Sequence, residues 1–395
     1  MPIDSSPHNR ARVAPLRLPH RDRWLDLLRG FAVIGVVGAH LRPLPESTYS
    51  PLLSAVGIWR HGGWVGVDAF FVLSGYLVSG LLFTEAKSRN RLNVGRFLIR
   101  RAFKIYPPFW ITVLLVLLAR YLLNSPVTAQ SVIGELLFLQ NYVGKISGTH
   151  WTLAVEEHFY LLLAFWMATC FFTFKRKAPD ALLRFPSVPW VSILTMVTCF
   201  YFRTLDWERE DYWQQVMKTH LRMDSLMFGV LLSWSRHFGP LAGINFGNLA
   251  SFFLFIAGIA CFIPAFSLPY ISGWFMAVPS YNLFFLGGGF LILAGTKVQI
   301  SNPVLKGIAG IGGYSYCIYL CHDPWQRYFV LRIVDPTDST LAWWAYFLLY
   351  TVGALVGGIV MSLIIEKPAL RLRDRFFPSQ SSLTGLPSPP SDRAP

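Results

Sequence analysis

Several ionisable side chains lie inside long apolar runs, where a charge costs several kcal/mol unless it is paired or hydrated. The first run contains Arg29 and His40, which are eleven positions apart and separated only by apolar residues and glycines. On a helix this spacing is about 16 Å along the axis, so His40 should lie in the outer half of a membrane if Arg29 lies near its cytoplasmic face. A histidine there can act as a general base, bind a metal or form a hydrogen bond between helices. The run alone leaves these roles open.

Carboxylates lie near the ends of two further runs. Asp68 follows a glycine-rich stretch and could face His40, or it could be a helix-terminal aspartate hydrated by lipid headgroups. Glu156 and Glu157 stand in the first turns of another run and are about 100° apart on a helix, so at most one points into a given cavity. A helix N-terminus favours an ionised carboxylate. We expect a functional role for one of the two glutamates.

Two pairs of charged residues complete the candidates. Arg101 and Lys104 end a basic segment and share one helix face, which makes them a possible clamp for phosphate oxygens or simply the basic flank of a membrane span. Arg222 and Asp224 can neutralise each other or partners on other helices, and we expect that role to be architectural.

The elements that position these residues follow from the composition. Of the 395 residues, 53% are hydrophobic and only 14% are charged, too few charges to coat a soluble body of this size. We therefore expect an all-α, polytopic integral membrane protein, because backbone amides in lipid need internal partners. The bulk of the chain is too apolar for intrinsic disorder, and its five cysteines all lie in apolar runs, which argues against a disulfide scaffold. About ten spans are predicted, at 25–43, 64–83, 106–123, 152–174, 189–204, 215–234, 248–265, 278–295, 309–330 and 341–365.

The basic residues set the expected orientation. Most Lys and Arg fall in segments that are cytoplasmic when the N-terminus is placed inside, and ten spans then leave both termini cytoplasmic. The net charge of +14 is thus explained by topology and contact with anionic membrane lipid, and we expect no nucleic-acid binding. Disordered cytoplasmic tails are expected at 1–22 and 376–395, around a transmembrane domain at 23–375. The alternative for 24–41 is a cleaved signal peptide.

The motifs, taken in order, resemble the membrane-bound acyltransferase 3 family. That family includes bacterial O-acetyltransferases of O-antigens, exopolysaccharides and Nod factors, and macrolide acyltransferases. Arg29 and His40 are similar to its motif of a basic residue and a histidine separated by ten residues. Arg101, Lys104 and Pro107 resemble its Arg-x-x-Arg-x-x-Pro motif, with lysine in the second basic place. Further similar stretches are 63–77, 151–160, 222–229, 315–322 and 366–368.

The resemblance implies a membrane O-acyltransferase, most simply an O-acetyltransferase, in a bacterial inner membrane. Its donor would be cytoplasmic acetyl-CoA or another acyl-CoA, with the coenzyme phosphates at Arg101 and Lys104 and with Arg29 nearby. Its acceptor would be a hydroxyl of a glycan such as an exopolysaccharide, an O-antigen or a lipid-linked sugar.

For catalysis, the resemblance points to His40 as general base and to Glu156 as the carboxylate that orients the imidazole. Asp68 would help to position the acceptor or His40. An acyl-histidine intermediate is the other possibility. Neither route needs a metal, and the metal-like spacing of Cys317, Cys321 and His322 is too faint to predict a zinc site.

Three other functions compete with this interpretation. The acceptor could be a macrolide-type secondary metabolite. The chain could instead be a transporter without acyl-transfer chemistry, although we find no repeated halves in the sequence. It could also be a non-enzymatic partner in polysaccharide export, in which case replacing His40 would be tolerated.

Overall fold

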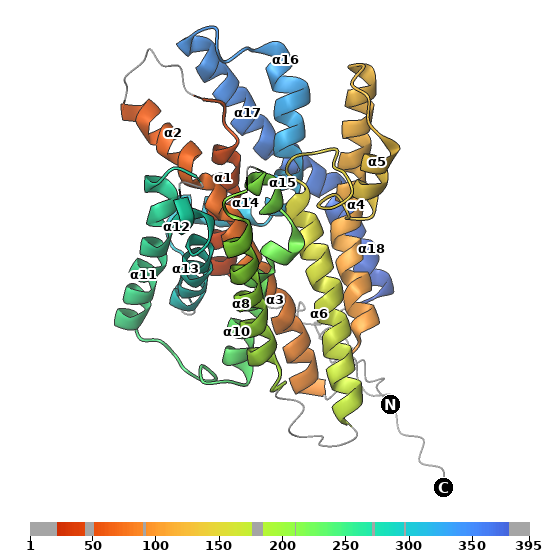
Figure 1. Cartoon of the computed structure of the whole chain (residues 1–395), viewed down its shortest axis with the longest axis vertical. Helices are drawn as coiled ribbons and strands as arrows, with labels where there is room; N and C mark the ends of the chain where they lie inside the picture. The colour runs from red at the N-terminus through yellow and green to blue at the C-terminus, as the bar shows by residue number, and fades with distance from the viewer. Residues whose placement is uncertain are drawn as a thin grey trace, which may run out of the picture.

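The structure is a computed structural model that describes residues 22–43, 51–89, 92–175, 185–209, 211–270, 273–295 and 298–378. Within these ranges it consists of helices and connecting turns without a β-strand (Figure 1), which confirms the all-α prediction. The expected tails lie outside the described residues, except for Asp22 and residues 376–378.

The elements in chain order are α1 (Arg23–Ala39), α2 (Pro51–Gly62), the 3-10 turn η1 (Gly63–Val65), α3 (Gly66–Arg89), α4 (Val94–Leu122), α5 (Ala129–Leu136), α6 (Trp151–Lys175), α8 (Val188–Asp206), α9 (Tyr212–Gln215), η2 (Thr219–Leu221), α10 (Met223–His237), α11 (Asn248–Ser267), α12 (Gly273–Ala277), α13 (Ser280–Ala294), α14 (Pro303–Gly312), α15 (Ser315–Trp325), the π-helical η3 (Gln326–Val330), α16 (Leu331–Ile333), α17 (Thr340–Met361), the π-helical η4 (Ser362–Glu366) and α18 (Lys367–Phe376).

Six stretches of helix in the described ranges are long and apolar enough to cross a membrane, and a seventh results if the bent pair of α14 and α15 counts as one span. The other expected spans coincide with α1, α10 and α13, which have 17, 15 and 15 residues. These helices are shorter than the roughly 20 residues that cross the hydrocarbon core. Ten spans and cytoplasmic termini therefore remain predictions.

Two expected spans differ in detail from the helices observed. The span expected at 215–234 contains the short turn η2 and becomes a regular helix only at Met223, because charged and polar residues interrupt the apolar pattern before that point. The span expected at 309–330 is bent by 75° between α14 and α15. The bend falls beside Gly312, where a Cβ atom would come within 1.8 Å of the Asp26 carbonyl oxygen on α1.

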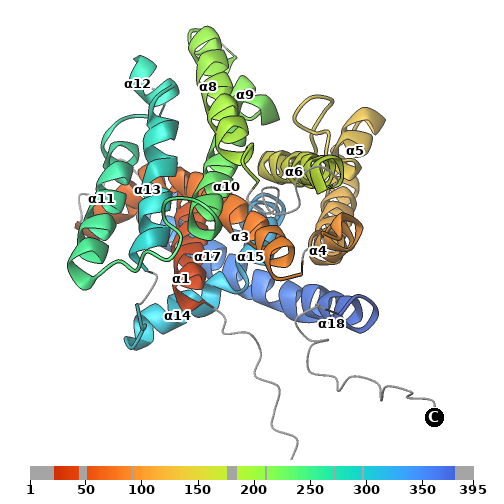
Figure 2. The same ribbon diagram turned by 90° about the horizontal axis from the view of Figure 1, so that it is seen from below.

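Helix α1 packs against α3, α14 and α15 and lies near the middle of the bundle when the molecule is seen from below (Figure 2). It begins at the N-cap Asp22, whose side chain accepts from the Trp24 amide at 3.0 Å. The backbones of α1 and η1 approach closely at Gly35 and Gly63, where a Cβ on Gly63 would lie 2.1 Å from the Gly35 carbonyl oxygen. Small residues at such crossings allow close packing of membrane helices, as expected for the glycines of this run.

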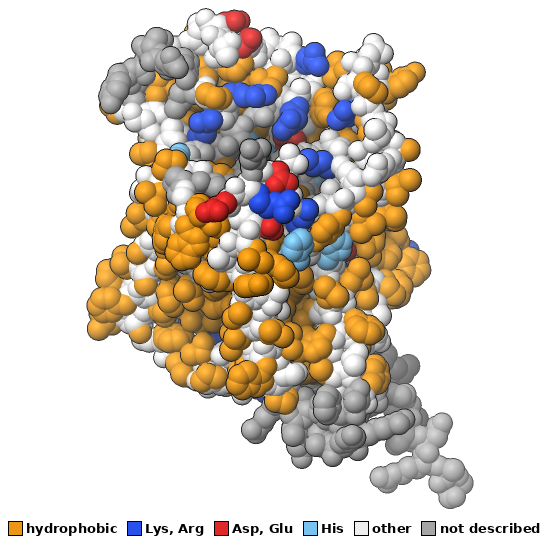
Figure 3. Space-filling model, viewed as in Figure 1, with side chains coloured by type: hydrophobic (Ala, Val, Ile, Leu, Met, Phe, Trp, Pro, Cys, Tyr) orange, Lys and Arg blue, Asp and Glu red, His pale blue; other side chains and the backbone are white. Residues whose placement is uncertain are grey.

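The surface is apolar over much of its height. Figure 3 shows hydrophobic side chains across the middle and lower parts of the visible face, with charged side chains gathered in the upper part. Large exposed hydrophobic residues on α8 and α11 include Trp190, Leu194, Phe252 and Phe253. Such faces are stable against lipid tails, and together with the long apolar helices they indicate a multi-pass membrane protein.

Candidate active site

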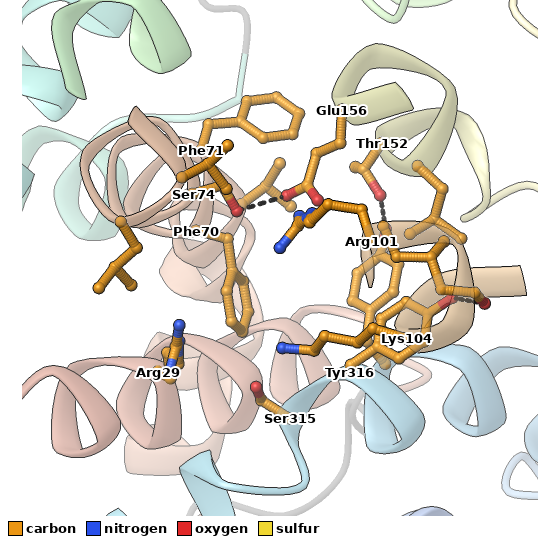
Figure 4. A pocket seen from close by; sticks show the side chains of 16 residues that line it. Arg29, Phe70, Phe71, Ser74, Arg101, Lys104, Thr152, Glu156, Ser315 and Tyr316 are labelled. Atoms are coloured by element: carbon orange, nitrogen blue, oxygen red, sulfur yellow. Dashed lines mark hydrogen bonds between the residues drawn. The ribbon is translucent and has the colours of Figure 1, made fainter. Parts of the chain in front are cut away.

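Four of the predicted site residues meet in one cavity inside the bundle. Arg29 from α1 and Arg101 and Lys104 from α4 line a cavity of about 110 Å³, together with Glu156 from α6. Figure 4 shows the three basic side chains pointing into the same space, with Glu156 beside Arg101. The remaining polar or aromatic side chains of the wall include Ser74, Thr152, Ser315, Tyr316 and Tyr319.

Glu156 is held in place by two hydroxyl groups. Ser74 Oγ donates to its Oε1 at 2.8 Å, and Tyr160 Oη donates to its Oε2 at 2.7 Å. The Arg101 guanidinium lies 4.0 Å from the centre of the Tyr160 ring, a cation–π contact that fixes the arginine next to this carboxylate. The carboxylate therefore stays in the cavity wall beside the cations.

One basic side chain of the cavity, Arg101, keeps a donor that could bind an anion. Lys104 interacts electrostatically with both Arg29 and Arg101, so like charges are held together in a buried space. The Arg101 Nε atom is buried and has no hydrogen-bond partner among the described residues. Arg29 pairs with Asp26 at 3.1 Å, and Lys104 also interacts with Glu156 and Glu366, so the free donor of Arg101 is the one that can bind phosphate or another anion.

Only one of the two adjacent glutamates faces the cavity, as the 100° argument predicted. The Glu157 side chain points elsewhere and accepts a hydrogen bond from Tyr106 Oη at 3.1 Å. It is buried but does not line the cavity with Glu156.

A second cavity extends this site toward one end of the bundle. It measures about 360 Å³, and its walls share Arg29, Lys104 and Tyr316 with the first cavity. Its other lining residues include Asp22 and Arg373, which lie close to the two ends of the described chain. Asp26, Glu366 and Lys367 also line it, so basic and acidic side chains flank the way from this end of the bundle toward Glu156, and residues near both described ends take part.

His40 lies outside this cavity, at the C-terminal end of α1. Its Nδ1 atom is 2.9 Å from the Val36 carbonyl oxygen, and its backbone carbonyl accepts from Gln326 Nε2 at 2.6 Å. Its ring packs edge-on against His322 of α15, with the ring centroids 4.8 Å apart. Tyr319, which does line the cavity, lies 5.3 Å from the His322 ring by centroids. His40 is thus connected to the cavity wall through α15.

The expectation that Glu156 contacts His40 is not met in the described ranges. The hydrogen bonds of the Glu156 carboxylate go to Ser74 and Tyr160, and none joins it to the imidazole. These two partners were not among the predicted site residues. Tyr160 could have been found, because it lies one helical turn after Glu156 on the same helix face.

Neither alternative for Asp68 is observed, since its contacts do not include His40 and it is not a hydrated aspartate at the helix end. Asp68 is fully buried, and its Oδ1 accepts from Arg222 Nη2 at 2.9 Å and from Ser225 Oγ at 3.2 Å. A buried carboxylate needs a cation, and the start of α10 supplies one. Asp224 in turn pairs with Arg203 at 2.6 Å, so Arg222 and Asp224 neutralise partners on other helices.

A buried carboxylate–imidazole pair, which was not predicted, lies close enough to His322 to interact with it. His150, just before α6, bonds through Nδ1 to Glu135 of α5, and Glu135 also accepts from the Ile146 amide at 3.0 Å. Both side chains are almost completely buried, at 1% and 0% exposed. Glu135 and His150 are fifteen positions apart between α4 and α6, and neither was among the predicted site residues.

Comparison with known proteins gives one family and several relatives. The profile of a family described as an acyltransferase domain matches residues 22–363. The peptidoglycan O-acetyltransferase OatA of Listeria monocytogenes is 29% identical over 333 residues, which are 76% of this chain and 48% of that protein. The O-acetyltransferase OatA of Staphylococcus aureus is 26% identical over 343 residues, 79% of this chain and 52% of that protein.

A putative O-acetyltransferase of Staphylococcus aureus strain COL is 27% identical over 227 residues, 53% of this chain and 34% of that protein. The chain thus spans about a third to a half of the length of these curated relatives. No solved structure matches it significantly.

Proposed function

This chain belongs to the acyltransferase domain family, and from that premise we propose that it is an O-acetyltransferase of a bacterial inner membrane. It takes an acetyl group from cytoplasmic acetyl-CoA and places it on a hydroxyl of a glycan. The observation that carries the proposal is the convergence of Arg29, Arg101 and Lys104 in one buried cavity.

The basic side chains of the two cavities suit the phosphates of the donor. Coenzyme A carries a diphosphate and a further phosphate; Arg101 and Arg29 carry planar guanidinium groups that match such oxygens, while Lys104 adds a point charge. The second cavity gives this molecule a route from the end of the bundle where both described chain ends lie. The thioester arm then extends past Tyr319 toward the His322–His40 pair.

His40 is suited to act on the thioester because its hydrogen bond to the backbone identifies which ring nitrogen is free to react. A carbonyl oxygen only accepts, so Nδ1 of His40 carries the proton bonded to Val36 and Nε2 presents a lone pair. In one route Nε2 takes the proton of the acceptor hydroxyl, whose oxygen attacks the thioester carbon while the carbon–sulfur bond breaks. In the other route Nε2 itself accepts the acyl group.

Glu156 has a different role in this proposal from the one expected of it. It balances part of the positive charge in the cavity and holds Arg101 through the shared contact with Tyr160. It is therefore a positioning residue for the donor, while His40 meets the reacting carbon.

A glycan acceptor is favoured by the relatives, since all three are named as O-acetyltransferases and one of them for peptidoglycan. The decisive experiment supplies the purified chain with labelled acetyl-CoA, with and without a cell-envelope glycan preparation. Label should move to the glycan, and His40→Ala should reduce that transfer by at least about 100-fold.

His237→Ala is the matched control, since His237 also bonds a backbone carbonyl but lies on α10 away from the cavity. The control should transfer label normally. Near-normal transfer by a folded His40→Ala protein would show that His40 is not the catalyst, and solute flux without thioester consumption would instead indicate a transporter.

A further inference from the structure

His322 is the second imidazole beside the cavity and has no role in the mechanism so far. It is fully buried on α15, and its ring meets that of His40 at a centroid distance of 4.8 Å and an interplanar angle of 72°. Because α1 and α15 pack directly against each other, this contact belongs to the helix bundle itself.

Hydrogen bonds define the reactive nitrogen of His322 as they do for His40. Its Nδ1 lies 2.5 Å from the Tyr319 carbonyl oxygen and therefore carries the ring proton. Its Nε2 is buried, presents a lone pair, and has no hydrogen-bond partner in the described part of the chain. A buried acceptor of this kind is unfavourable unless a donor reaches it at some stage.

The surroundings keep the two rings together. Gln326, one turn after His322, donates from Nε2 to the His40 carbonyl at 2.6 Å and to Tyr346 Oη at 2.7 Å. Tyr319, one turn before His322, lines the donor cavity. Helix α15 therefore spans the distance between the donor cavity and His40.

Three titratable side chains also lie around His322. It interacts electrostatically with His40, Asp323 and His150. Asp323 is paired with Arg327 at 2.6 Å, and His150 with Glu135. Asp323 is the anion next to His322 in the chain, and its pair with Arg327 fixes its position.

We propose that His322 is a second catalytic base and that the two imidazoles divide the reaction. His40 Nε2 receives the acyl group, and His322 Nε2 receives the proton of the acceptor hydroxyl. This inference rests on the proposed function and selects the acyl-histidine route within it.

The reaction has two steps, acylation of His40 and transfer of the acyl group to the acceptor. His40 Nε2 attacks the thioester carbon, a carbon–nitrogen bond forms, the carbon–sulfur bond breaks, and the thiolate leaves. The acceptor oxygen then attacks the acyl carbon, a carbon–oxygen bond forms, the carbon–nitrogen bond breaks, and the hydroxyl proton moves to His322. His322 later releases this proton to solvent, and the thiolate takes one from solvent.

A second base is required in this route for a simple reason. Once His40 Nε2 carries an acyl group it has no lone pair left, so it cannot also accept the hydroxyl proton. His322 is the imidazole in ring contact with His40, and its lone pair is defined and unused among the described residues.

The test separates the two steps in the full chain, purified into lipid nanodiscs. Exchange of label between acetyl-CoA and free CoA reports the first step. Transfer from the labelled enzyme to a cell-envelope glycan preparation, or to water, reports the second. His322→Gln and His322→Asn should slow the second step by at least about 100-fold while exchange continues. His237→Gln, on α10, is the control and should alter neither step.

Each other outcome has a defined meaning. Wild-type rates of transfer in either folded His322 variant overturn the proposal. Loss of exchange together with transfer, in a variant that melts at the wild-type temperature, places His322 in the first step and also overturns it. A wild-type enzyme that transfers without exchange refutes the divided reaction only. One that neither exchanges nor transfers contradicts the proposed function itself.

Discussion

At the scale of single residues, the two glutamates of α6 show how strongly position on a helix decides a role. Glu156 faces the basic cavity and is held by Ser74 and Tyr160, whereas Glu157 turns toward Tyr106 on α4. Both are carboxylates in the same turn. Their difference therefore comes from orientation, which a substitution can test directly.

Glu156→Gln should reduce acetyl transfer at least about tenfold, equivalent to about 1.4 kcal/mol, and Glu157→Gln should have a smaller effect. The amide keeps the size of the side chain but has one acceptor oxygen, so it cannot hold both Ser74 and the Tyr160 that positions Arg101. Initial rates with labelled acetyl-CoA measure both variants. A larger loss for Glu157→Gln would show that the wrong glutamate has been assigned to the site.

Arg101→Ala should raise KM for acetyl-CoA by about tenfold to 100-fold, because a charge-assisted hydrogen bond contributes about 1.5–3 kcal/mol. KM for the glycan should change little, since Arg101 lines only the donor cavity in this proposal. Arg332→Ala, at an exposed site on α16, is the control. Equal losses for donor and acceptor would count against a phosphate clamp.

Among the helices, close crossings determine where the side chains of the site lie. Helix α1 brings Arg29 to the cavity and His40 to α15, and it can do so because it lies close against α14. At Gly30 a Cβ atom would lie 2.2 Å from the Ile308 backbone oxygen, so even one methyl group must push the two helices apart.

Gly30→Ala should therefore destabilise the folded protein by about 1–3 kcal/mol, the usual cost of overpacking. Gly310→Ala on α14 is the matched control, since nothing lies within 4 Å of its added Cβ, and it should be neutral or slightly stabilising. Thermal melting in detergent compares the two. Equal melting temperatures would mean that α1 and α14 can separate without cost.

The Asp68–Arg222 pair connects α3 to the start of α10, and its role in this structure is architectural. Arg222 also lies 4.3 Å from the centre of the Tyr281 ring, so it is enclosed on several sides. Asp68→Asn should destabilise the protein by about 3–5 kcal/mol, because it leaves a buried guanidinium without its carboxylate.

Melting of Asp68→Asn should be compared with that of Asp338→Asn, an exposed control, and of the double variant Asp68→Asn with Arg222→Met. The double variant should recover part of the lost stability, since no charge is then left unpaired. A folded Asp68→Asn protein with normal melting but no activity would return Asp68 to the reaction.

At the scale of the whole molecule, the sequence predicted the helices better than the pairing of side chains across them. Hydropathy located α4, α6, α11 and α17, because long apolar runs can only be helices in lipid. The convergence of Arg29, Arg101 and Lys104 was also expected. The partners of Asp68 and Glu135 were not, because they depend on how distant segments pack, and helical spacing carries no information about that.

The orientation of the chain in the membrane can be tested by labelling introduced cysteines from either side. Both described ends lie at the mouth of the second cavity, while the loop before α17 lies at the other end of a continuous helix from Thr340 to Phe376. Cysteines introduced at Arg23 and Asp374 should react with an impermeant maleimide only in inverted vesicles, and one at Asp335 only in right-side-out vesicles. The unmodified chain is the control for labelling of its native cysteines. Labelling of Arg23→Cys and Asp374→Cys from opposite sides would show that the two ends do not lie on the same side of the membrane.

The surplus of positive charge around Glu156 has a practical consequence for the bench. A small chamber in which Arg101 keeps a free donor beside Lys104 will also attract inorganic phosphate, sulfate or pyrophosphate, and these ions will compete with the donor. Kinetic work in phosphate buffer would then overstate KM for acetyl-CoA. Titration with pyrophosphate offers a simple way to count the sites that such ions share with the coenzyme.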